Sequence, residues 1–169
     1  MKNYKMVAFS VLLTLIGCDS DGQDINDDGT DLPFSSTNLK GDWVKSAEFV
    51  GQPGDTLGSK TPSEDILSAL DACQKDDIFR YDVGSSDQGN PYVWGIGQIA
   101  CEGQTADDFI EIGTWTLDDS GKLDISYSDV SEPYVLISLT SKRLLVRKAS
   151  GTITPDGTVF PFTEYVRKD

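Results

Sequence analysis

The groups available for chemistry in this chain are mostly carboxylates. Its 169 residues include 28 Asp and Glu, 14 Lys and Arg, and no His. Ser-His-Asp and Cys-His nucleophilic sites both use an imidazole as general base, so the composition excludes them. The lack of His also removes the residue that most often ligates metals.

Two arrangements of acids match part of a catalytic pattern. Asp119-Ser120-Gly121 resembles half of an aspartic-protease signature, but that chemistry needs two carboxylates that share a proton, and no second Asp-Ser/Thr-Gly occurs. Asp and Gly are common turn residues, so a hairpin turn is the favoured interpretation. Glu111 and Asp124 could pair as glycosidase carboxylates, but nothing in the sequence sets the separation that this chemistry requires. We therefore expect that the protein is not an enzyme.

A calcium site is the other chemistry that the acids suggest. Asp24, Asn26 and Asp28 alternate in a segment that matches the start of an EF-hand loop, D-x-N-x-D-G. The twelfth position is Ser35 in place of the bidentate Glu, and Pro33 does not suit the helix that should follow. A solvated tether is favoured over a calcium site, and we expect no cofactor.

The first 17 residues have the pattern of an export signal. Lys2 and Lys5 precede an apolar run over residues 6–16, which is too short to span a bilayer as a helix. The run ends in Leu15-Ile16-Gly17-Cys18, which resembles the bacterial lipobox. The resemblance implies cleavage before Cys18, acylation of Cys18 as a lipid anchor, and a place in the bacterial cell envelope. That place would be the outer membrane, on its periplasmic face or the cell surface, with the inner membrane as an alternative.

The remaining two cysteines form an even pair. If Cys18 carries lipid, Cys73 and Cys101 are left in an exported chain, which favours a disulfide over two reduced thiols. Such a bond would close a loop of about 29 residues and stabilise the fold by roughly 3–4 kcal/mol in the chain-entropy model.

The negative net charge of the chain limits the classes of partner that it can bind. Loss of residues 1–17, with two Lys and no acid, changes the formal charge from −14 to −16. An acidic chain lacks the basic footprint that nucleic acid requires, and it is not attracted to anionic lipid. Contact with a membrane is therefore expected through the lipid anchor only.

The chain divides into signal (1–17), acylated Cys and acidic tether (18–38) and domain (39–169). Within the domain, Thr61, Pro62 and Glu64 form a capping box that predicts one short helix ending near Cys73. Short alternating segments separated by turn residues predict strands. Eight are expected: 41–50, 77–83, 91–99, 108–117, 122–128, 133–140, 142–149 (with a possible continuation to Thr154) and 158–167. We predict an all-β fold, an eight-stranded antiparallel up-and-down barrel.

Several motifs together resemble the lipocalin-like domain of small bacterial lipoproteins. They are Leu39-Lys40-Gly41-Asp42-Trp43, Cys73-Gln74-Lys75-Asp76-Asp77-Ile78-Phe79, Gly113-Thr114-Trp115-Thr116-Leu117 with Lys122-Leu123-Asp124-Ile125, Leu139-Thr140-Ser141-Lys142-Arg143-Leu144-Leu145-Val146, and Thr163-Glu164-Tyr165-Val166-Arg167. The match covers residues 39–167 and departs from the family at 51–72 and 84–99. It implies that Trp43 packs at the closed end of the barrel beneath a late-strand Arg, either Arg167 or Arg147.

The barrel interior holds the remaining candidates. The residues proposed to line a calyx are Phe79, Tyr81, Trp94, Trp115, Tyr127, Phe160 and Phe162. Alternation should point about half of the strand aromatics inward. They would then line a ligand cavity or fill the core, and small barrels are often filled.

The resemblance implies binding of a small apolar molecule. We therefore expect a lipid-anchored envelope binding protein. The alternative is a protein–protein module, an inhibitor or assembly factor of the envelope, with a filled barrel and with loops 51–72 and 84–92 as its contact surface.

Overall fold

The structure, a computed structural model, describes residues 29–54, 66–85 and 89–168. Antiparallel strands dominate this part of the chain. The strands are β1 Gly41–Gly51, β2 Ile78–Tyr81, β3 Asn90–Gly95, β4 Phe109–Leu117, β5 Lys122–Tyr127, β6 Val130–Leu139, β7 Arg143–Lys148, β8 Thr152–Thr154 and β9 Gly157–Arg167. The described residues also form helical segments: α1 Ser36–Leu39, the 3-10 helix η1 Ile66–Ala69 and α2 Ala72–Lys75. Among these segments, none has the length and apolar character of a membrane-crossing helix.

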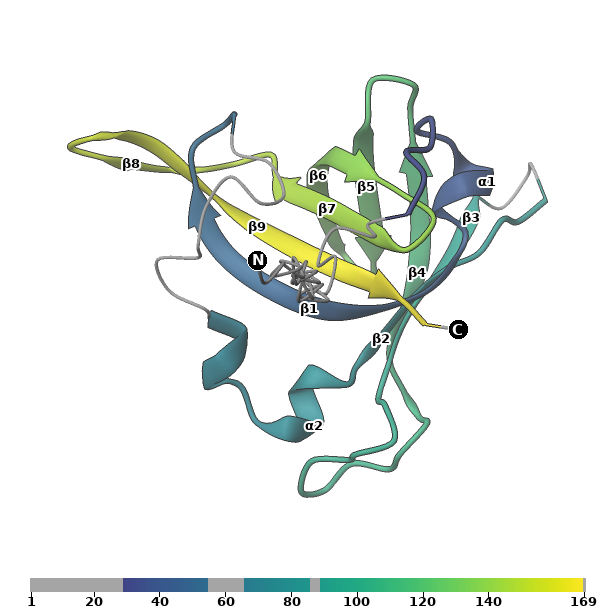
Figure 1. Cartoon of the computed structure of the whole chain (residues 1–169). Coiled ribbons are helices and arrows are strands. Elements are labelled where there is room, and N and C mark those ends of the chain that lie inside the picture. The colour runs from purple at the N-terminus through teal and green to yellow at the C-terminus, as the bar shows by residue number, and fades with distance from the viewer. Residues whose placement is uncertain (1–28, 55–65, 86–88, 169) are drawn as a thin grey trace, which may run out of the picture.

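Eight of the strands close into a barrel. Each strand from β1 to β6 pairs with the next one in the chain, β7 pairs with β9, and β9 pairs back onto β1. The β1–β9 ladder runs from Trp43 opposite Arg167 to Gly51 opposite Phe160, and it crosses the front of Figure 1 as the blue and yellow arrows. This closure leaves no long unpaired edge. The predicted eight-stranded antiparallel up-and-down barrel is confirmed.

The β4–β5 hairpin shows how local sequence builds the barrel. The carboxylate of Asp118 accepts hydrogen bonds from the backbone N–H groups of Ser120 and Lys122, each at 2.9 Å. Gly121 takes a φ of +85°, which a residue without a Cβ adopts readily. Beyond the turn, β5 alternates between buried and exposed residues, with Leu123 and Ile125 facing the interior. The hairpin interpretation of Asp119-Ser120-Gly121 therefore agrees with the structure.

One end of the barrel is closed by the segment that precedes β1. This closed end comprises the start of β1, the end of β9 and the β4–β5 and β6–β7 turns. Asp31 pairs with Thr140, and the N–H of Leu32 donates to the carbonyl of Leu139 at 2.9 Å. Phe34 packs against the core beside Gly121. The described part of the expected tether, residues 29–38, thus belongs to the folded body, and ordered contacts begin before the expected boundary at Leu39.

The opposite end is the mouth, formed by the end of β1, the segment 66–77 and the loop 96–108. A disulfide joins Cys73 in α2 to Cys101 in that loop, with 5.2 Å between the Cα atoms. The predicted disulfide is confirmed. Asp76 adds a second link, because its carboxylate accepts from the N–H of Ile99 at 2.8 Å. These links tie two mouth segments together that are far apart in sequence.

The predicted helix is wrong in its extent. Residues 55–65, with the capping box Thr61–Glu64, lie outside the described part of the chain. After these residues, η1 ends at Ala69 and α2 begins only at Ala72. The break falls at Asp71, whose backbone N–H donates to the side-chain oxygen of Gln74 at 3.2 Å. A local cap therefore starts a new helical turn. The helical turn α1 was not predicted at all.

Two strand predictions are also corrected. The strand predicted over 91–99 ends at Gly95, because Ile96 turns away and donates its N–H to the carbonyl of Asp108 at 2.7 Å. The strand predicted from 142 ends at Lys148 and does not run on to Thr154. Residues 152–154 form the separate strand β8, which pairs with β9 in a hairpin that projects from the barrel (Figure 1).

Candidate functional site

An open cavity of about 250 Å³ occupies the mouth half of the barrel. Its walls come from β1, β2, β3, β5, β6, β7 and β9. The lining residues are Lys45, Glu48, Phe79, Tyr81, Tyr92, Trp94, Leu123, Ile125, Tyr127, Glu132, Tyr134, Val146, Lys148, Thr163 and Tyr165. Seven of these fifteen side chains are aromatic, and four charged side chains stand among them. The lining therefore combines aromatic faces with many hydroxyl and charged groups, so it can contact both the apolar and the polar parts of a small molecule.

The floor of the cavity is a packed aromatic layer. Trp115 is fully buried, and the ring of Tyr81 meets it edge-on with 5.6 Å between centroids. The indole N–H of Trp115 is shared by the carbonyls of Asp82 and Pro91, each at 3.0 Å. Because this buried donor has acceptors, the floor carries no desolvation penalty from it. Burial also raises the pKa of Tyr81, which therefore stays a neutral phenol.

One side wall depends on a glycine. Gly113 of β4 lies opposite Tyr92 on one neighbouring strand and Tyr127 on the other. A Cβ at Gly113 would collide with the carbonyl of Ser126 and lie 2.9 Å from the Cβ of Tyr127. With no side chain between them, the rings of Tyr92 and Tyr127 stack with 6.5 Å between centroids.

A neighbouring part of the wall is an aromatic group on β2, β3 and β9. Phe79 stacks against Trp94 at 5.9 Å and meets Tyr165 edge-on at 5.2 Å. The indole N–H of Trp94 donates to the carboxylate of Asp77 at 3.0 Å. Asp77 is 8% exposed, and burial raises its pKa while the hydrogen bond from Trp94 lowers it. This bond links the cavity wall to the segment that the disulfide holds.

The charged groups lie in two pairs near the mouth. The ammonium of Lys45 is 3.2 Å from the carboxylate of Glu48, and that of Lys148 is 4.0 Å from Glu132. The phenol of Tyr134 donates a hydrogen bond to the carboxylate of Glu132. The pKa of Tyr134 is raised, chiefly by burial and then by this bond, so its hydroxyl keeps its proton at neutral pH.

The structure brings together four of the seven residues expected to line a calyx. Phe79, Tyr81, Trp94 and Tyr127 line the cavity. Trp115 faces inward but forms the floor below it. Phe160 and Phe162 do not line the cavity, and this part of the prediction is wrong. On β9 the cavity-lining residues are Thr163 and Tyr165, so alternation turns Phe160 and Phe162 to the outer face.

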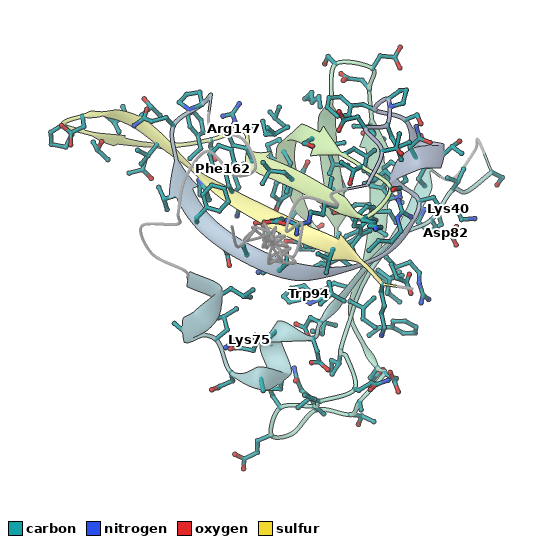
Figure 2. All side chains as sticks on the ribbon, viewed as in Figure 1. Lys40, Lys75, Asp82, Trp94, Arg147 and Phe162 are labelled. Carbon is teal, nitrogen blue, oxygen red and sulfur yellow. A yellow bond between two sulfur atoms is a disulfide. The ribbon has the colours of Figure 1, made fainter. Side chains whose placement is uncertain are left out.

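On that outer face Phe162 belongs to a second apolar cluster. It stacks on Phe49 with 5.1 Å between centroids and an interplanar angle of 4°, and Leu145 completes the buried set. The guanidinium of Arg147 lies 4.2 Å from the ring centroid of Phe160. Figure 2 shows Arg147 and Phe162 together near the β8–β9 hairpin, far from Lys40 and Asp82, whose ion pair marks the closed end.

At the closed end the guanidinium of Arg167 lies 4.2 Å from the ring centroid of Trp43. Arg147, the alternative partner, is on the outer face instead. Cys18 and the weak calcium candidates Asp24, Asn26 and Asp28 lie outside the described residues.

Sequence reasoning missed most of the polar lining of the cavity. The missed residues are Lys45, Glu48, Glu132, Tyr134, Lys148, Thr163 and Tyr165. Strand alternation could have identified two of them. Lys45 is two residues after Trp43, and Tyr165 is two residues before Arg167. Alternation therefore places each on the same inward-facing side of its strand as that neighbour. A β-bulge in β1 between Lys45 and Ala47 then breaks this rule, so that Glu48 also reaches the cavity.

Comparisons with known proteins add little to this geometry. No family model matches the chain, and no curated protein matches it. Among solved structures, an odorant-binding protein, OBP1, is similar over 82% of this chain and 77% of its own, with 12% sequence identity and a TM-score of 0.42. The strand pairing itself assigns the chain to the eight-stranded up-and-down barrels, the class that includes lipocalins.

Proposed function

We propose that this protein is a lipid-anchored binding protein of the bacterial cell envelope that holds one small molecule in its barrel. The observation that carries the proposal is the open cavity, whose lining combines aromatic rings with hydroxyl and charged groups. A filled barrel would have favoured the alternative function, a protein–protein module. Pockets for drug-sized ligands measure roughly 300–1,000 Å³, so a cavity of about 250 Å³ suits a smaller molecule.

The described chain enters the barrel on the side away from the mouth. Gly29, the first described residue, lies beside the Ser141 turn at the closed end, on the far side of the barrel from the mouth. If Cys18 carries lipid, the segment that follows it meets the barrel at the closed end.

Native mass spectrometry of the protein released from its source envelope in mild detergent tests the binding role. A retained mass beyond that of the acylated polypeptide supports it, and the same mass should be lost when the cavity is blocked. A bare polypeptide mass, together with no uptake of small aromatic probes by the purified protein, would count against a binding role.

The anchor has its own test. Inhibition of lipoprotein signal peptidase with globomycin should cause the uncleaved precursor to accumulate. The Cys18→Ala variant should yield no acylated protein. Normal processing under globomycin would refute the lipoprotein assignment while leaving the binding role intact.

A second function, a protein–protein module, is supported by a groove on the outer wall. This groove, of about 150 Å³, includes Ile78, Val93 and Phe109, and Phe109 is 55% exposed. Ile112, opposite Val93 in the β3–β4 ladder, is 64% exposed. A photo-crosslinking residue at Ile112 in the producing cells should capture a partner that the same residue at exposed Thr116, on the same strand, does not. Equal yields at both positions would remove this candidate.

A further inference from the structure

The two charged pairs at the mouth differ in how tightly they are held. Lys45 and Glu48 are close, at 3.2 Å, and their side chains are only 19% and 27% exposed. Lys148 and Glu132 are 4.0 Å apart, beyond hydrogen-bonding distance, and the Lys148 side chain is 46% exposed. A flexible lysine with that exposure can leave the cavity for water at little cost, because exposed ion pairs contribute little to stability.

Glu132 has acceptor capacity that the Tyr134 hydroxyl does not fill. A carboxylate offers about four lone-pair positions, and the Tyr134 phenol uses one of them. The hydroxyl also holds the carboxylate against the cavity wall, where both residues line the space that a ligand would enter. An N–H donor on a ligand can therefore reach Glu132 from inside the cavity.

The rings of the cavity already receive ammonium groups. The Nζ of Lys148 is 6.0 Å from the ring centroid of Tyr134, and the Nζ of Lys45 is 6.0 Å from that of Phe79. A cation over an aromatic face is attracted by the ring quadrupole, and aromatic-lined sites use this to bind organic ammonium groups. The ammonium of Lys148 thus marks a position, between a ring and a carboxylate, that suits a ligand cation.

The net charge of the whole chain also favours a positively charged ligand. The formal net charge is −14, and a net negative charge raises the concentration of cations and lowers that of anions near the protein. A carboxylate-bearing ligand would enter against this field and would meet Glu48 and Glu132 at the rim, where each lysine already faces an acid.

We propose that the cavity binds a small organic amine with an aromatic or apolar body. Its ammonium takes the place of the Lys148 ammonium, beside Glu132 and the Tyr134 ring, and its body lies among Phe79, Trp94 and Tyr127. This assignment rests on the proposed binding function and specifies the class of ligand.

Calorimetric titration of the mature protein with three matched probes tests the assignment. The probes are 2-phenylethylamine, the neutral 2-phenylethanol and the anionic 3-phenylpropionate, at pH 7 and low salt. We expect the amine to bind at least tenfold more tightly than the propionate. Glu132→Gln should weaken amine binding about tenfold and change binding of the alcohol less than twofold. Lys148→Met, which removes the competing ammonium, should strengthen amine binding.

Asp119→Asn is the matched control, because it removes one acid from an exposed position at the closed end and should leave all three affinities unchanged. Propionate binding as tight as amine binding, or equal losses of amine and alcohol in Glu132→Gln, would overturn the amine assignment and keep the binding function. If none of the probes gives saturable heat, the amine assignment fails, and the native mass spectrum decides separately whether the cavity binds anything. Circular dichroism of each variant confirms that the barrel is folded.

Discussion

Arg167, the last residue of β9, covers the ring of Trp43 on β1 at 4.2 Å and ties down the chain that closes the barrel. Its guanidinium donates to the carbonyls of Asn38, Lys40 and Ser141 at 2.8, 2.6 and 3.0 Å. Trp43 in turn donates its indole N–H to the carbonyl of Leu39 at 2.9 Å. The start of β1 and the end of β9 therefore meet in one hydrogen-bonded cluster around Arg167 and Trp43, which we call the plug.

Arg167→Lys should destabilise the fold by about 1–3 kcal/mol, because lysine keeps the charge but cannot donate to three carbonyls from a planar fork. Urea unfolding of the two proteins measures the difference in free energy. Lys168→Ala, a change at the exposed neighbouring residue, should stay within about 0.5 kcal/mol of the wild type. Ligand affinity should not change, since the plug is at the opposite end from the cavity. A similar loss in both variants would mean that the plug does not stabilise the barrel.

Val146→Phe should block the cavity. Val146 is buried and lines the interior from β7, so a larger side chain there occupies space that a ligand needs. We expect at least a tenfold loss of probe affinity, and a cost of about 1–3 kcal/mol in stability from overpacking. Calorimetry and urea unfolding measure the two effects. Val130→Phe, at an exposed site on β6, should leave both unchanged, and unchanged affinity in Val146→Phe would place the ligand elsewhere.

The disulfide should stabilise both the fold and the mouth. Cys73→Ser with Cys101→Ser is expected to cost about 3–4 kcal/mol by the chain-entropy model. Because the bond also fixes α2 against the 96–108 loop, probe affinity should fall as well. Thermal unfolding with and without reductant supplies the control, since reductant should destabilise the wild type and leave the double variant unchanged. A reductant effect on the double variant would point to a different cause.

Asp77 should make stability depend on pH in a predictable direction. Burial raises its pKa in the folded state above the ordinary value of 3.8, so the folded protein holds this proton more strongly than the unfolded chain. The resulting stabilisation is complete below the unfolded pKa and is lost as pH rises through the folded pKa. Asp77→Asn should therefore gain stability relative to the wild type as pH rises from 3 to 7, measured by urea unfolding at each pH.

Trp94→Phe tests the same dependence of stability on the protonation of Asp77. It removes the N–H donor that lowers the pKa of Asp77, so the loss of stability should move to higher pH. A profile identical to the wild type would show that Asp77 does not carry the pH dependence.

Much of the barrel could be predicted because its signals are local. Turn residues such as Asp118 and Gly121 act through bonds within a few positions, so the hairpins and the number of barrel strands follow from short stretches of sequence. The predicted pairing of Cys73 with Cys101 followed from a count of cysteines, on the expectation that the chain is exported and that Cys18 carries lipid. The helix after β1 was misjudged because a second local cap, at Asp71, interrupts a pattern that looked continuous.

The inner face of each strand was harder to predict, because a side chain's face depends on register. Phe162 and Tyr165 are both aromatic residues of the closing strand, yet Phe162 stacks on Phe49 outside the barrel and Tyr165 lines the cavity. The β1 bulge shifts register by one residue and brings Glu48 beside Lys45, an outcome set by pairing with β9.

The residue pattern was sufficient for a β-barrel, its hairpins and its disulfide, since these follow from turns, alternation and composition along the chain. Whether the barrel is open, and which charges stand at its rim, depends on contacts between strands that are distant in sequence. Glu132 meets Lys148 only because β6 pairs with β7, and Phe79 meets Tyr165 only because β1 holds β2 and β9 on either side.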